Sequence, residues 1–336
     1  MGTAPLRWGI IGTGRFGRIH AKAIQSLHGL ELVAMSNRSS ERLDQAVADF
    51  QVPRSYPDFQ QLLDDPHVDA VSITTHWRDH FEITKAALAA GKHVLLEKPM
   101  AESAEQCNEL VKLVRQAKGR FMVGHICRFD PRVTLAKAAI DAWRIGRIVS
   151  MHAKRNLPTA PGWLRLDKTS PLMGDGVHDT DVMMWFLGQA PTRVFARYVR
   201  VNQFTYPDIG WAMLEFGDQA IGVVETNWCL PANSPTVIDA KIEVVGTEGA
   251  MTIDCSQTGL TILDVNGLKM VDTDYWPEQH GDLVGILRDE IEYFATCIRD
   301  GRPPDVVSPE EAARVVAVLE TAEQSAESGL PLAFEG

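Results

Sequence analysis

The stretch GIIGTGRFG at residues 9–17 decides the fold. It holds Gly12, Gly14 and Gly17 in the pattern G-x-G-x-x-G, after an apolar run and before a helical pattern. The first glycine permits a tight turn, the second lets backbone N–H groups approach a pyrophosphate, and the third lets the helix pack on the strand. This context predicts a dinucleotide site rather than a glycine turn without a ligand. The predicted cofactor residues of the loop are Gly12, Thr13, Gly14, Arg15, Phe16 and Gly17.

The first third of the chain repeats this order of strand and helix. A helical pattern follows most of the apolar runs, and Gly91 and Gly119 end two of these helices. Strands that alternate with helices of this length predict a parallel sheet covered on both faces, which is an α/β Rossmann domain. The predicted strands lie at 6–11, 31–36, 70–75, 93–97 and 121–126.

The pattern changes after about residue 145. Successive strand patterns there predict an α+β domain with a large open, mainly antiparallel sheet. Asn266 and Gly267 stand between two apolar runs and predict a hairpin. Ser308 and Glu311 predict a capping box at the start of the last helix. The predicted helices of this region lie at 176–187, 282–299 and 309–327.

The length of 336 residues fits two domains. We expect a dinucleotide-binding domain at 1–123 and a substrate-binding and oligomerisation domain at 124–336, whose C-terminal helix could pack back on the first domain. The formal net charge of −11 argues against nucleic acid and anionic membranes as partners.

The five cysteines are scattered without a C-x-x-C pair, as is typical of reduced thiols in a cytoplasmic protein. The pattern of Cys and His predicts no metal site. The start of the chain lacks the pattern of a signal peptide or a membrane span. We therefore expect a cytoplasmic location.

The choice between NAD and NADP depends on the end of the second strand, where NAD-binding proteins usually carry an acid. Asn37 stands at that position and Arg38 follows. A guanidinium can pair with a 2′-phosphate, so the sequence favours NADP. Asn37 could also bind a plain ribose hydroxyl, which leaves NAD open. Thr74, Thr75 and His76 end a parallel strand and are predicted to border the cofactor.

A second informative stretch is HVLLEKPM at residues 93–100, where a buried strand runs into Glu97, Lys98 and Pro99. Loops that follow buried parallel strands commonly carry the chemistry of α/β proteins. Partial burial there would lower the pKa of Lys98 and suit it to proton transfer. An ordinary exposed lysine is the alternative.

Four motifs together resemble the Gfo/Idh/MocA family of NAD(P)-dependent oxidoreductases. They are GIIGTGRFGRIHA at 9–21, EKPM at 97–100, GHICRFDPR at 124–132 and GDGVHDTDVMMWFLG at 174–188. The resemblance covers nearly the whole chain. It implies that Lys98 lies near the nicotinamide and the reacting carbon, and that the peptide before Pro99 is cis. Glu97 is predicted to orient Lys98 or the backbone of the substrate domain, and is counted with the cofactor-binding residues. The resemblance also implies a homo-oligomer, a dimer or tetramer, formed through the second-domain sheet.

The resemblance implies a second group of catalytic residues, on the helix that holds His178 and Asp181. These two side chains are three residues apart and share a helix face. The family has an acid four residues before the histidine, whereas this chain has Gly174 there and Asp175 one residue later. His178 is the expected acid–base residue after Lys98, with Asp175 and Asp181 as partners, and a structural histidine is the alternative.

Two arginines are expected to bind substrate beside Lys98, Asp175 and His178. Arg128 resembles a position near the family's substrate pocket, with a structural ion pair as the alternative. Arg155 and Lys154 lie on one predicted strand, whose alternation does not decide which of them faces the pocket. Trp163 and Trp228 could stack on a sugar or fill the core.

These features predict an oxidoreductase that transfers a hydride between NAD(P) and a CH–OH or keto group of a sugar, cyclitol or similar polyhydroxy substrate. A hydrolase or eliminase that holds its redox cofactor through one cycle is an alternative. Another is a non-catalytic NAD(P)-binding regulator, because a fold does not fix function.

Overall fold

The computed structural model describes residues 4–159, 165–166, 168–256 and 259–335. The chain divides into two compact units. We call residues 1–129 and 274–313 the Rossmann unit, and residues 130–273 and 314–336 the sheet unit. The division expected from the sequence placed residues 274–313 in the second domain, whereas the structure groups this segment with the first unit.

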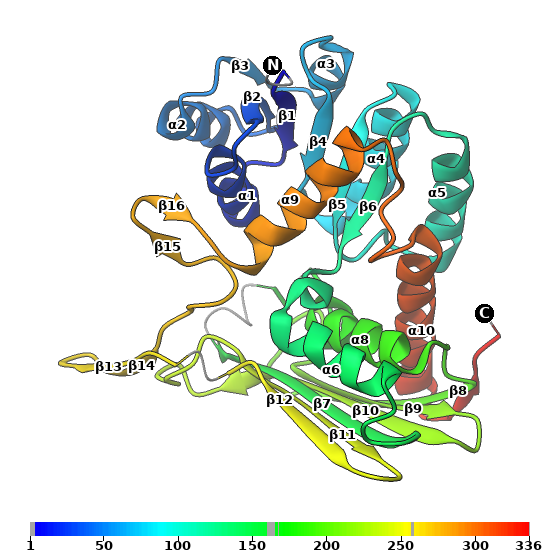
Figure 1. The fold of residues 1–336 in the computed structure, drawn as a ribbon. Helices are drawn as coiled ribbons and strands as arrows, with labels where there is room; N and C mark the ends of the chain where they lie inside the picture. The colour runs from blue at the N-terminus through cyan, green and yellow to red at the C-terminus, as the bar shows by residue number, and fades with distance from the viewer. Residues whose placement is uncertain (1–3, 160–164, 167, 257–258, 336) are drawn as a thin grey trace. The chain divides into compact units, whose positions relative to one another are not determined.

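The Rossmann unit is built on a six-stranded parallel sheet with the order β3-β2-β1-β4-β5-β6, which confirms the predicted fold class. Helix α1 packs beside α2 and α9, and α4 packs beside α3 and α5 (Figure 1). The strands are β1 (Leu6–Ile11), β2 (Leu30–Ser36), β3 (Arg54–Tyr56), β4 (Ala70–Ile73), β5 (His93–Glu97) and β6 (Phe121–Gly124). The helices are α1 (Arg15–Gln25), α2 (Ser40–Phe50), α3 (Phe59–Asp64), α4 (His80–Ala89), α5 (Ala104–Gln116) and α9 (Ile286–Arg299), with 3-10 turns η1 (Trp77–Asp79) and η2 (Ile126–Phe129).

Helix α9 explains why residues 274–313 belong to the Rossmann unit. Its buried positions recur at helical spacing and include Leu287, Ile291 and Phe294. The ring of Phe294 meets that of Trp8 on β1 edge to face, with centroids 6.0 Å apart. An apolar helix face of this kind is stable only when it is covered, and the Rossmann unit covers it.

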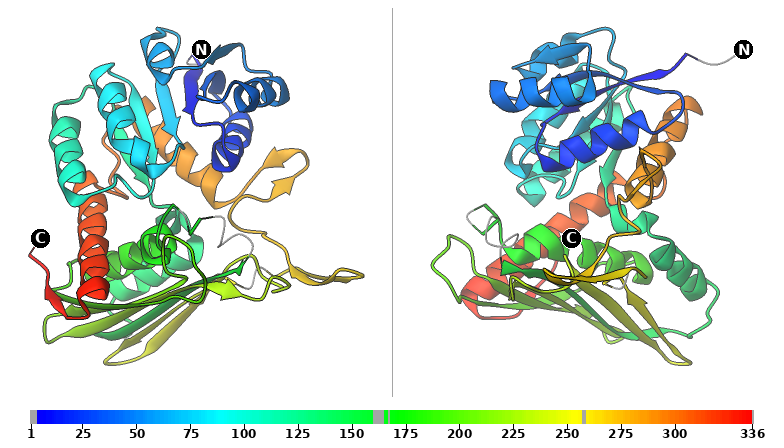
Figure 2. Two further views of the ribbon diagram at one scale, coloured as in Figure 1. Left: turned by 180° about the vertical axis from the view of Figure 1, so that it is seen from behind. Right: turned by 90° about the vertical axis from the view of Figure 1, so that its left-hand side faces the viewer.

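The sheet unit holds a seven-stranded sheet with the order β12-β11-β7-β10-β9-β8-β17 (Figure 2). Strands β7 and β10 pair in parallel and the other neighbours pair antiparallel, as predicted for a mainly antiparallel sheet. The strands are β7 (Ile148–Pro158), β8 (Arg193–Val199), β9 (Ile209–Phe216), β10 (Ala220–Leu230), β11 (Asp239–Gly246), β12 (Ala250–Asp254) and β17 (Leu332–Ala333).

Helices α6 (Pro131–Asp141) and α8 (Val177–Leu187) pack on one face of this sheet. A single π-helical turn, η3 (Leu172–Gly176), leads into α8. Helix α10 (Pro309–Ser328) begins in the Rossmann unit and continues in the sheet unit. Its capping box is confirmed, because the Glu311 N–H donates to Ser308 Oγ and the Ser308 N–H donates to Glu311 Oε2.

The predicted hairpin is present as β13 (Thr261–Asp264) and β14 (Gly267–Met270), but it does not join the large sheet as expected. Nearly all of its side chains are exposed, so it buries no apolar face against a neighbour. A second short ribbon is formed by β15 (Glu278–Gln279) and β16 (Asp282–Leu283). Within the part of the chain that the structure describes, no helix is both long and apolar enough to cross a bilayer.

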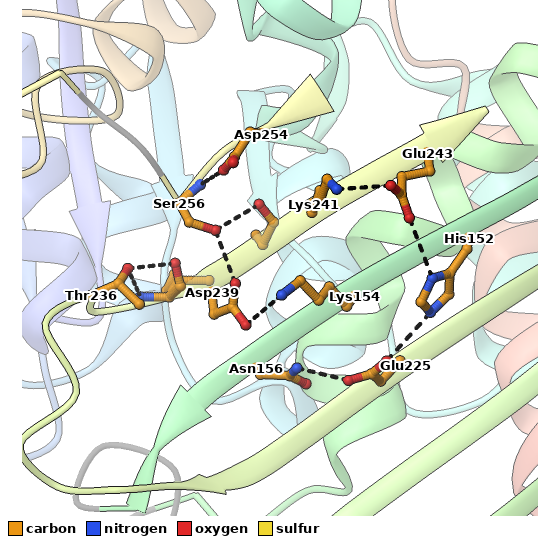
Figure 3. A network of polar contacts seen from close by, with 12 residues as sticks. His152, Lys154, Asn156, Glu225, Thr236, Asp239, Lys241, Glu243, Asp254 and Ser256 are labelled. Atoms are coloured by element: carbon orange, nitrogen blue, oxygen red, sulfur yellow. Dashed lines mark hydrogen bonds and ion pairs between the residues drawn. The ribbon is translucent and has the colours of Figure 1, made fainter. Parts of the chain in front are cut away.

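The two faces of the seven-stranded sheet differ in polarity. On β7, Arg155 pairs with Asp179 of α8, so alternation turns Lys154 to the opposite face, which we call the outer face. Figure 3 shows that this face carries a network of charged side chains from β7, β10 and β11. Lys154 donates to Asp239 at 2.7 Å, and the ring of His152 lies between Glu225 and Glu243.

Candidate active site

The glycine loop has the geometry that a dinucleotide phosphate needs. Gly12 has a φ of +101°, a region that only glycine enters readily. A Cβ on Gly17 would lie 2.0 Å from the Gly12 carbonyl oxygen, so only glycine permits this contact between helix and loop. A Cβ on Gly14, in contrast, would meet no atom within 4 Å. The space above Gly14 is therefore open to a ligand.

Helix α1 begins directly at this open space. Its N-cap is Gly14, which gives no side-chain hydrogen bond, and its first turn holds no acidic residue. The first N–H groups and the positive end of the helix dipole are thus available to an anion. Arg15 is exposed at the start of α1, and the Phe16 ring meets the rings of His20 and Trp276 edge to face. The residues present fit the pyrophosphate of NAD or NADP.

The end of β2 lies against the same loop. The Asn37 side-chain amide donates to Thr13 Oγ1 at 2.7 Å, and its Oδ1 accepts from the Ser39 N–H at 2.9 Å. The guanidinium of Arg38 is 81% exposed and donates to Asp79 at 2.6 Å. Asn37 therefore ties two loops together, while Arg38 already has a carboxylate partner that the sequence did not indicate.

The loop after β4 is held from both sides. The Thr74 hydroxyl donates to the Gly12 carbonyl at 2.7 Å. The buried His80 ring has Nδ1 2.8 Å from the Pro99 carbonyl oxygen and Nε2 3.3 Å from the Thr75 carbonyl oxygen. Burial lowers the pKa of His80. This histidine joins the loop after β4, which also holds His76, to the loop that carries Lys98.

Lys98 directly follows β5, and the peptide between Lys98 and Pro99 is cis, as the resemblance implied. Its neighbour Glu97 is buried, with Oε1 3.1 Å from Nε2 of His20. The other nitrogen of His20 lies 3.1 Å from Ser72 Oγ, which accepts from the indole of Trp8. The Glu97 carboxylate therefore lies inside the Rossmann unit. There it is the end of a series of polar contacts that runs through His20 and Ser72 to Trp8.

The second group of expected catalytic residues lies in the sheet unit. His178 and Asp181 are buried in α8, one turn apart. Asp175 lies in the π-helical turn, where the spacing differs from that of the family, and π turns often occur at functional sites. Its two carboxylate oxygens lie 3.3 and 3.2 Å from Nη1 of Arg165, a residue that sequence reasoning did not single out.

The two expected substrate arginines are buried in ion pairs. Arg155 holds Asp179 through two hydrogen bonds, of 3.1 and 2.9 Å. Arg128 donates to Glu311 at 2.9 Å and to the Val306 carbonyl at 2.8 Å. Asp179 is fully buried against that strand arginine.

Trp228 is also fully buried and packs with Leu157 and Leu166. It therefore fills the core, which is one of the two roles expected for it from the sequence. Trp163 lies outside the described residues. Among the residues that the structure does describe, no group of His, Cys, Asp and Glu side chains is arranged to hold a metal ion.

Sequence reasoning missed two buried polar residues of the Rossmann unit, His20 and Glu290. Each lies among the buried residues of an amphipathic helix, at a position where an apolar side chain is the usual choice. A polar residue in the apolar stripe of a helix was the signal that could have found them.

Comparison with known proteins agrees with this geometry. The model of the Gfo/Idh/MocA oxidoreductase family with an NAD-binding Rossmann fold matches residues 6–125, and that of the family's C-terminal domain matches residues 133–252. The chain is 34% identical to inositol 2-dehydrogenase of Pseudomonas fluorescens, over 76% of this chain and 72% of that protein. It is 29% identical to scyllo-inositol 2-dehydrogenase (NAD(+)) of Bacillus subtilis, over 98% of this chain and 96% of that protein.

Solved structures share the fold. Scyllo-inositol dehydrogenase from Lactobacillus casei with bound NAD(H) and scyllo-inositol superposes with a TM-score of 0.86 at 22% identity, over 98% of this chain and 99% of that one. The family models, the relatives and the glycine-loop geometry lead to one conclusion. The chain belongs to the Gfo/Idh/MocA family of oxidoreductases with an NAD-binding Rossmann fold.

Proposed function

We propose that the protein is a cyclitol dehydrogenase, which moves a hydride between a nicotinamide dinucleotide and a CH–OH or keto carbon of an inositol or a related sugar. The observation that carries this proposal is the position of Lys98. Strands β1, β4 and β5 are parallel neighbours in the sheet, so Gly12, Thr74 and Lys98, which follow them, lie together at the carboxyl ends of the strands. Open α/β sheets bind their ligands at the carboxyl ends of their strands.

The proposed catalytic residues handle the proton and the orientation of the substrate. When bound, the cofactor supplies the acceptor for the hydride. We assign to Lys98 and His178 the proton of the substrate hydroxyl, which must leave as the carbon loses its hydride. Asp181 and Asp175 would orient His178 or bind substrate hydroxyls. For Arg128 and Arg155 we propose structural roles, because their buried ion pairs occupy the guanidinium groups.

The substrate class rests on two relatives whose names state inositol dehydrogenation, at 34% and 29% identity. A polyhydroxy ring offers several hydroxyls to the charged groups proposed here, so it suits a site with a lysine, a histidine and carboxylates. We propose that Arg38 would bind the 2′-phosphate of NADP, which is the basis of the preference for NADP. The Asp79 carboxylate beside Arg38 weakens this preference, since it would repel a 2′-phosphate.

The proposal is tested by hydride transfer. Inositols deuterated at each ring carbon are incubated with the protein and NAD or NADP, and the nicotinamide product is analysed by mass spectrometry. We expect deuterium in the reduced cofactor in proportion to the keto product. A hydrolase that reoxidises its cofactor within the cycle would release a cleaved product without net reduced cofactor, and a regulator would bind cofactor and transfer nothing.

We further propose that the outer face of the seven-stranded sheet joins two copies of the chain in a homo-oligomer. This face exposes Trp211 and Ile221, which are 45% and 48% accessible, beside the charged network of Figure 3. A mixed face of this kind can pair with a second copy of itself. Trp211→Glu should lower the mass measured by light scattering, whereas Val265→Glu on the exposed β13–β14 turn should not. Equal masses for both variants would contradict this interface.

A cytoplasmic location also stays a proposal. All five cysteines are free thiols, as is common in a reducing compartment. Fractionation of cells that produce the protein at natural levels would test it, and recovery in a secreted fraction would contradict it.

A further inference from the structure

Arg165 is a charged residue beside the candidate site that the proposed mechanism leaves without a task. It lies in a turn of the sheet unit, where its carbonyl accepts from the N–H groups of Lys168 and Thr169 at 2.8 and 3.0 Å. Its side chain is 41% exposed, and its Nη1 atom contacts both carboxylate oxygens of Asp175. Asp175 is buried in the π-helical turn that leads into α8, three residues before His178. Arg165 therefore touches a side chain that we propose for substrate binding.

The geometry of this ion pair differs from that of other arginine–aspartate pairs in the chain. Arg155 holds Asp179 through both Nε and Nη2. Two further pairs share this two-pronged pattern, Arg7 with Asp69 and Arg132 with Asp130. Arg165 instead approaches Asp175 with Nη1 alone, at 3.3 and 3.2 Å. Its Nε and Nη2 groups have no hydrogen-bond partner among the residues that the structure describes, so their N–H donors are open to a ligand.

Trp228 fixes the position of this guanidinium. The ring of Trp228 is fully buried in the core of the sheet unit, and the guanidinium carbon of Arg165 lies 5.7 Å from its centroid. A Cβ on Gly174, in the π-helical turn, would lie 2.9 Å from Trp228 Cη2. The glycine therefore lets the tryptophan approach the turn that carries Asp175. Arginine and carboxylate are thus held relative to each other, as a preorganised ligand site requires.

The charges of the pair determine the class of ligand that it suits. The Asp175 carboxylate compensates the Arg165 guanidinium, so the pair offers acceptors beside donors without a net charge. An anionic ligand would be repelled by the carboxylate. A neutral polyhydroxy ring suits both halves of the pair, because each hydroxyl can donate as well as accept. A partly exposed ion pair adds little to stability, so a structural task does not account for it.

We propose that Arg165 is a specificity-determining residue, which donates to one hydroxyl of the substrate while Asp175 accepts from the neighbouring hydroxyl. The pair thereby selects neutral cyclitols with two adjacent hydroxyls over their deoxy and carboxylated relatives. The inference rests on the proposed function and names a group that recognises its substrate.

The test compares three variants of the turn on the inositol that wild type oxidises fastest. Arg165→Met removes the donors, Arg165→Lys keeps the charge without the planar fork, and Lys168→Met removes an exposed cation nearby as the matched control. We expect Arg165→Met to lower kcat/KM by about tenfold to a hundredfold, mainly through KM, because a hydrogen bond to a charged group is lost. Arg165→Lys should recover part of this loss. Lys168→Met should equal wild type, and all three melting temperatures should stay at the wild-type value.

Monodeoxy analogues of this inositol separate recognition of a hydroxyl from a general effect. One analogue, which lacks the hydroxyl that Arg165 binds, should be a poorer substrate of wild type and should react equally with Arg165→Met. The other analogues should keep most of the difference between the two proteins. A difference of the same size with every analogue would overturn the proposal, and so would wild-type kcat/KM in Arg165→Met. A lower melting temperature with equal losses of substrate and cofactor affinity would assign the arginine a structural role instead. Faster oxidation of a uronic acid than of any inositol would overturn the neutral ligand class.

A second readout does not depend on turnover. The cofactor-loaded protein is titrated with the same inositol in a calorimeter, and its affinity should fall by about tenfold or more in Arg165→Met. Binding that depends on Arg165 in a protein that reduces no cofactor would support the inference and refute the dehydrogenase proposal. Turnover of an inositol that Arg165→Met leaves unchanged would do the opposite, so the two failures are distinguishable.

Discussion

The Nη2 atom of Arg155 lies 2.9 Å from Oδ1 of Asp179, and both side chains are buried inside the sheet unit. This ion pair joins β7 to α8, the helix that carries His178 and Asp181. It gives a structural task to an arginine that the sequence suggested for substrate binding. The pair therefore holds α8 on the sheet. We expect its removal to lower the free energy of unfolding before any other property.

Arg155→Met should lower the free energy of unfolding by about 3–5 kcal/mol, because it removes the guanidinium that makes two hydrogen bonds to the buried Asp179 carboxylate. The double variant Arg155→Met with Asp179→Leu should recover most of the loss, since it removes both buried charges. Urea denaturation of the two variants measures this difference. A stable Arg155→Met protein whose only defect is a higher KM would mean that the arginine binds substrate after all.

The glycine loop offers a matched pair of alanine substitutions. Gly14→Ala adds a methyl group to open space at an ordinary φ of −69°, so its melting temperature should equal that of wild type while cofactor affinity falls by about tenfold or more. Gly17→Ala places a methyl group 2.0 Å from the Gly12 carbonyl and should cost about 1–3 kcal/mol of stability. Calorimetry and cofactor titration separate the two effects. Equal cofactor affinity in wild type and Gly14→Ala would show that the pyrophosphate does not lie over this residue.

Glu290 should make stability depend on pH. Its pKa in the folded protein is raised above the ordinary value of 4.5, so between these two values the folded state binds more protons than the unfolded state. Wild-type stability should therefore fall as pH rises through this window, by about 1.4 kcal/mol per pH unit relative to Glu290→Gln, which cannot ionise. Below the unfolded value the difference should be constant. Denaturation curves from pH 4 to pH 9 measure it, and parallel curves for the two proteins throughout would contradict a buried neutral Glu290.

Arg38 and Asp79 should act oppositely on the choice of cofactor. If the proposed preference for NADP is right, Arg38→Met should lower NADP affinity by about tenfold and leave NAD affinity within about twofold. Asp79→Asn should raise NADP affinity, because it frees the guanidinium and removes a carboxylate that would repel a 2′-phosphate. Fluorescence titration with both cofactors measures the ratio. Tight NAD binding that neither substitution alters would favour NAD as the natural cofactor.

The sequence predicted those parts of the fold that local chemistry determines. The glycine loop, the capping box of Ser308 and Glu311 and the hairpin at Asn266 and Gly267 are each set by a few neighbouring residues, and each is present in the structure. The short elements β3 and α3 were missed, because few buried residues mark them. The structure groups residues 274–313 with the first unit, which the sequence did not indicate, since the partner of an apolar helix face is set by tertiary packing.

The candidate site shows the same division. Because side chains alternate along a strand, Arg155 and Lys154 must face opposite sides of the sheet. Only the position of α8 shows which of the two is buried. The contact of His20 with Glu97 joins residues far apart in the sequence, and no local pattern predicts it. The motif at Lys98 could be recognised in advance, while the groups that surround it could not.

The central claim is that Lys98 carries proton transfer in a cyclitol dehydrogenase. Its most direct test is the initial rate of cofactor reduction with a panel of inositols and sugars, with NAD and NADP in parallel, for wild type and Lys98→Met. We predict reduction by wild type with at least one inositol, and a loss of about a thousandfold in kcat for Lys98→Met with cofactor affinity retained. Wild-type turnover that survives Lys98→Met unchanged would contradict the role assigned to the lysine.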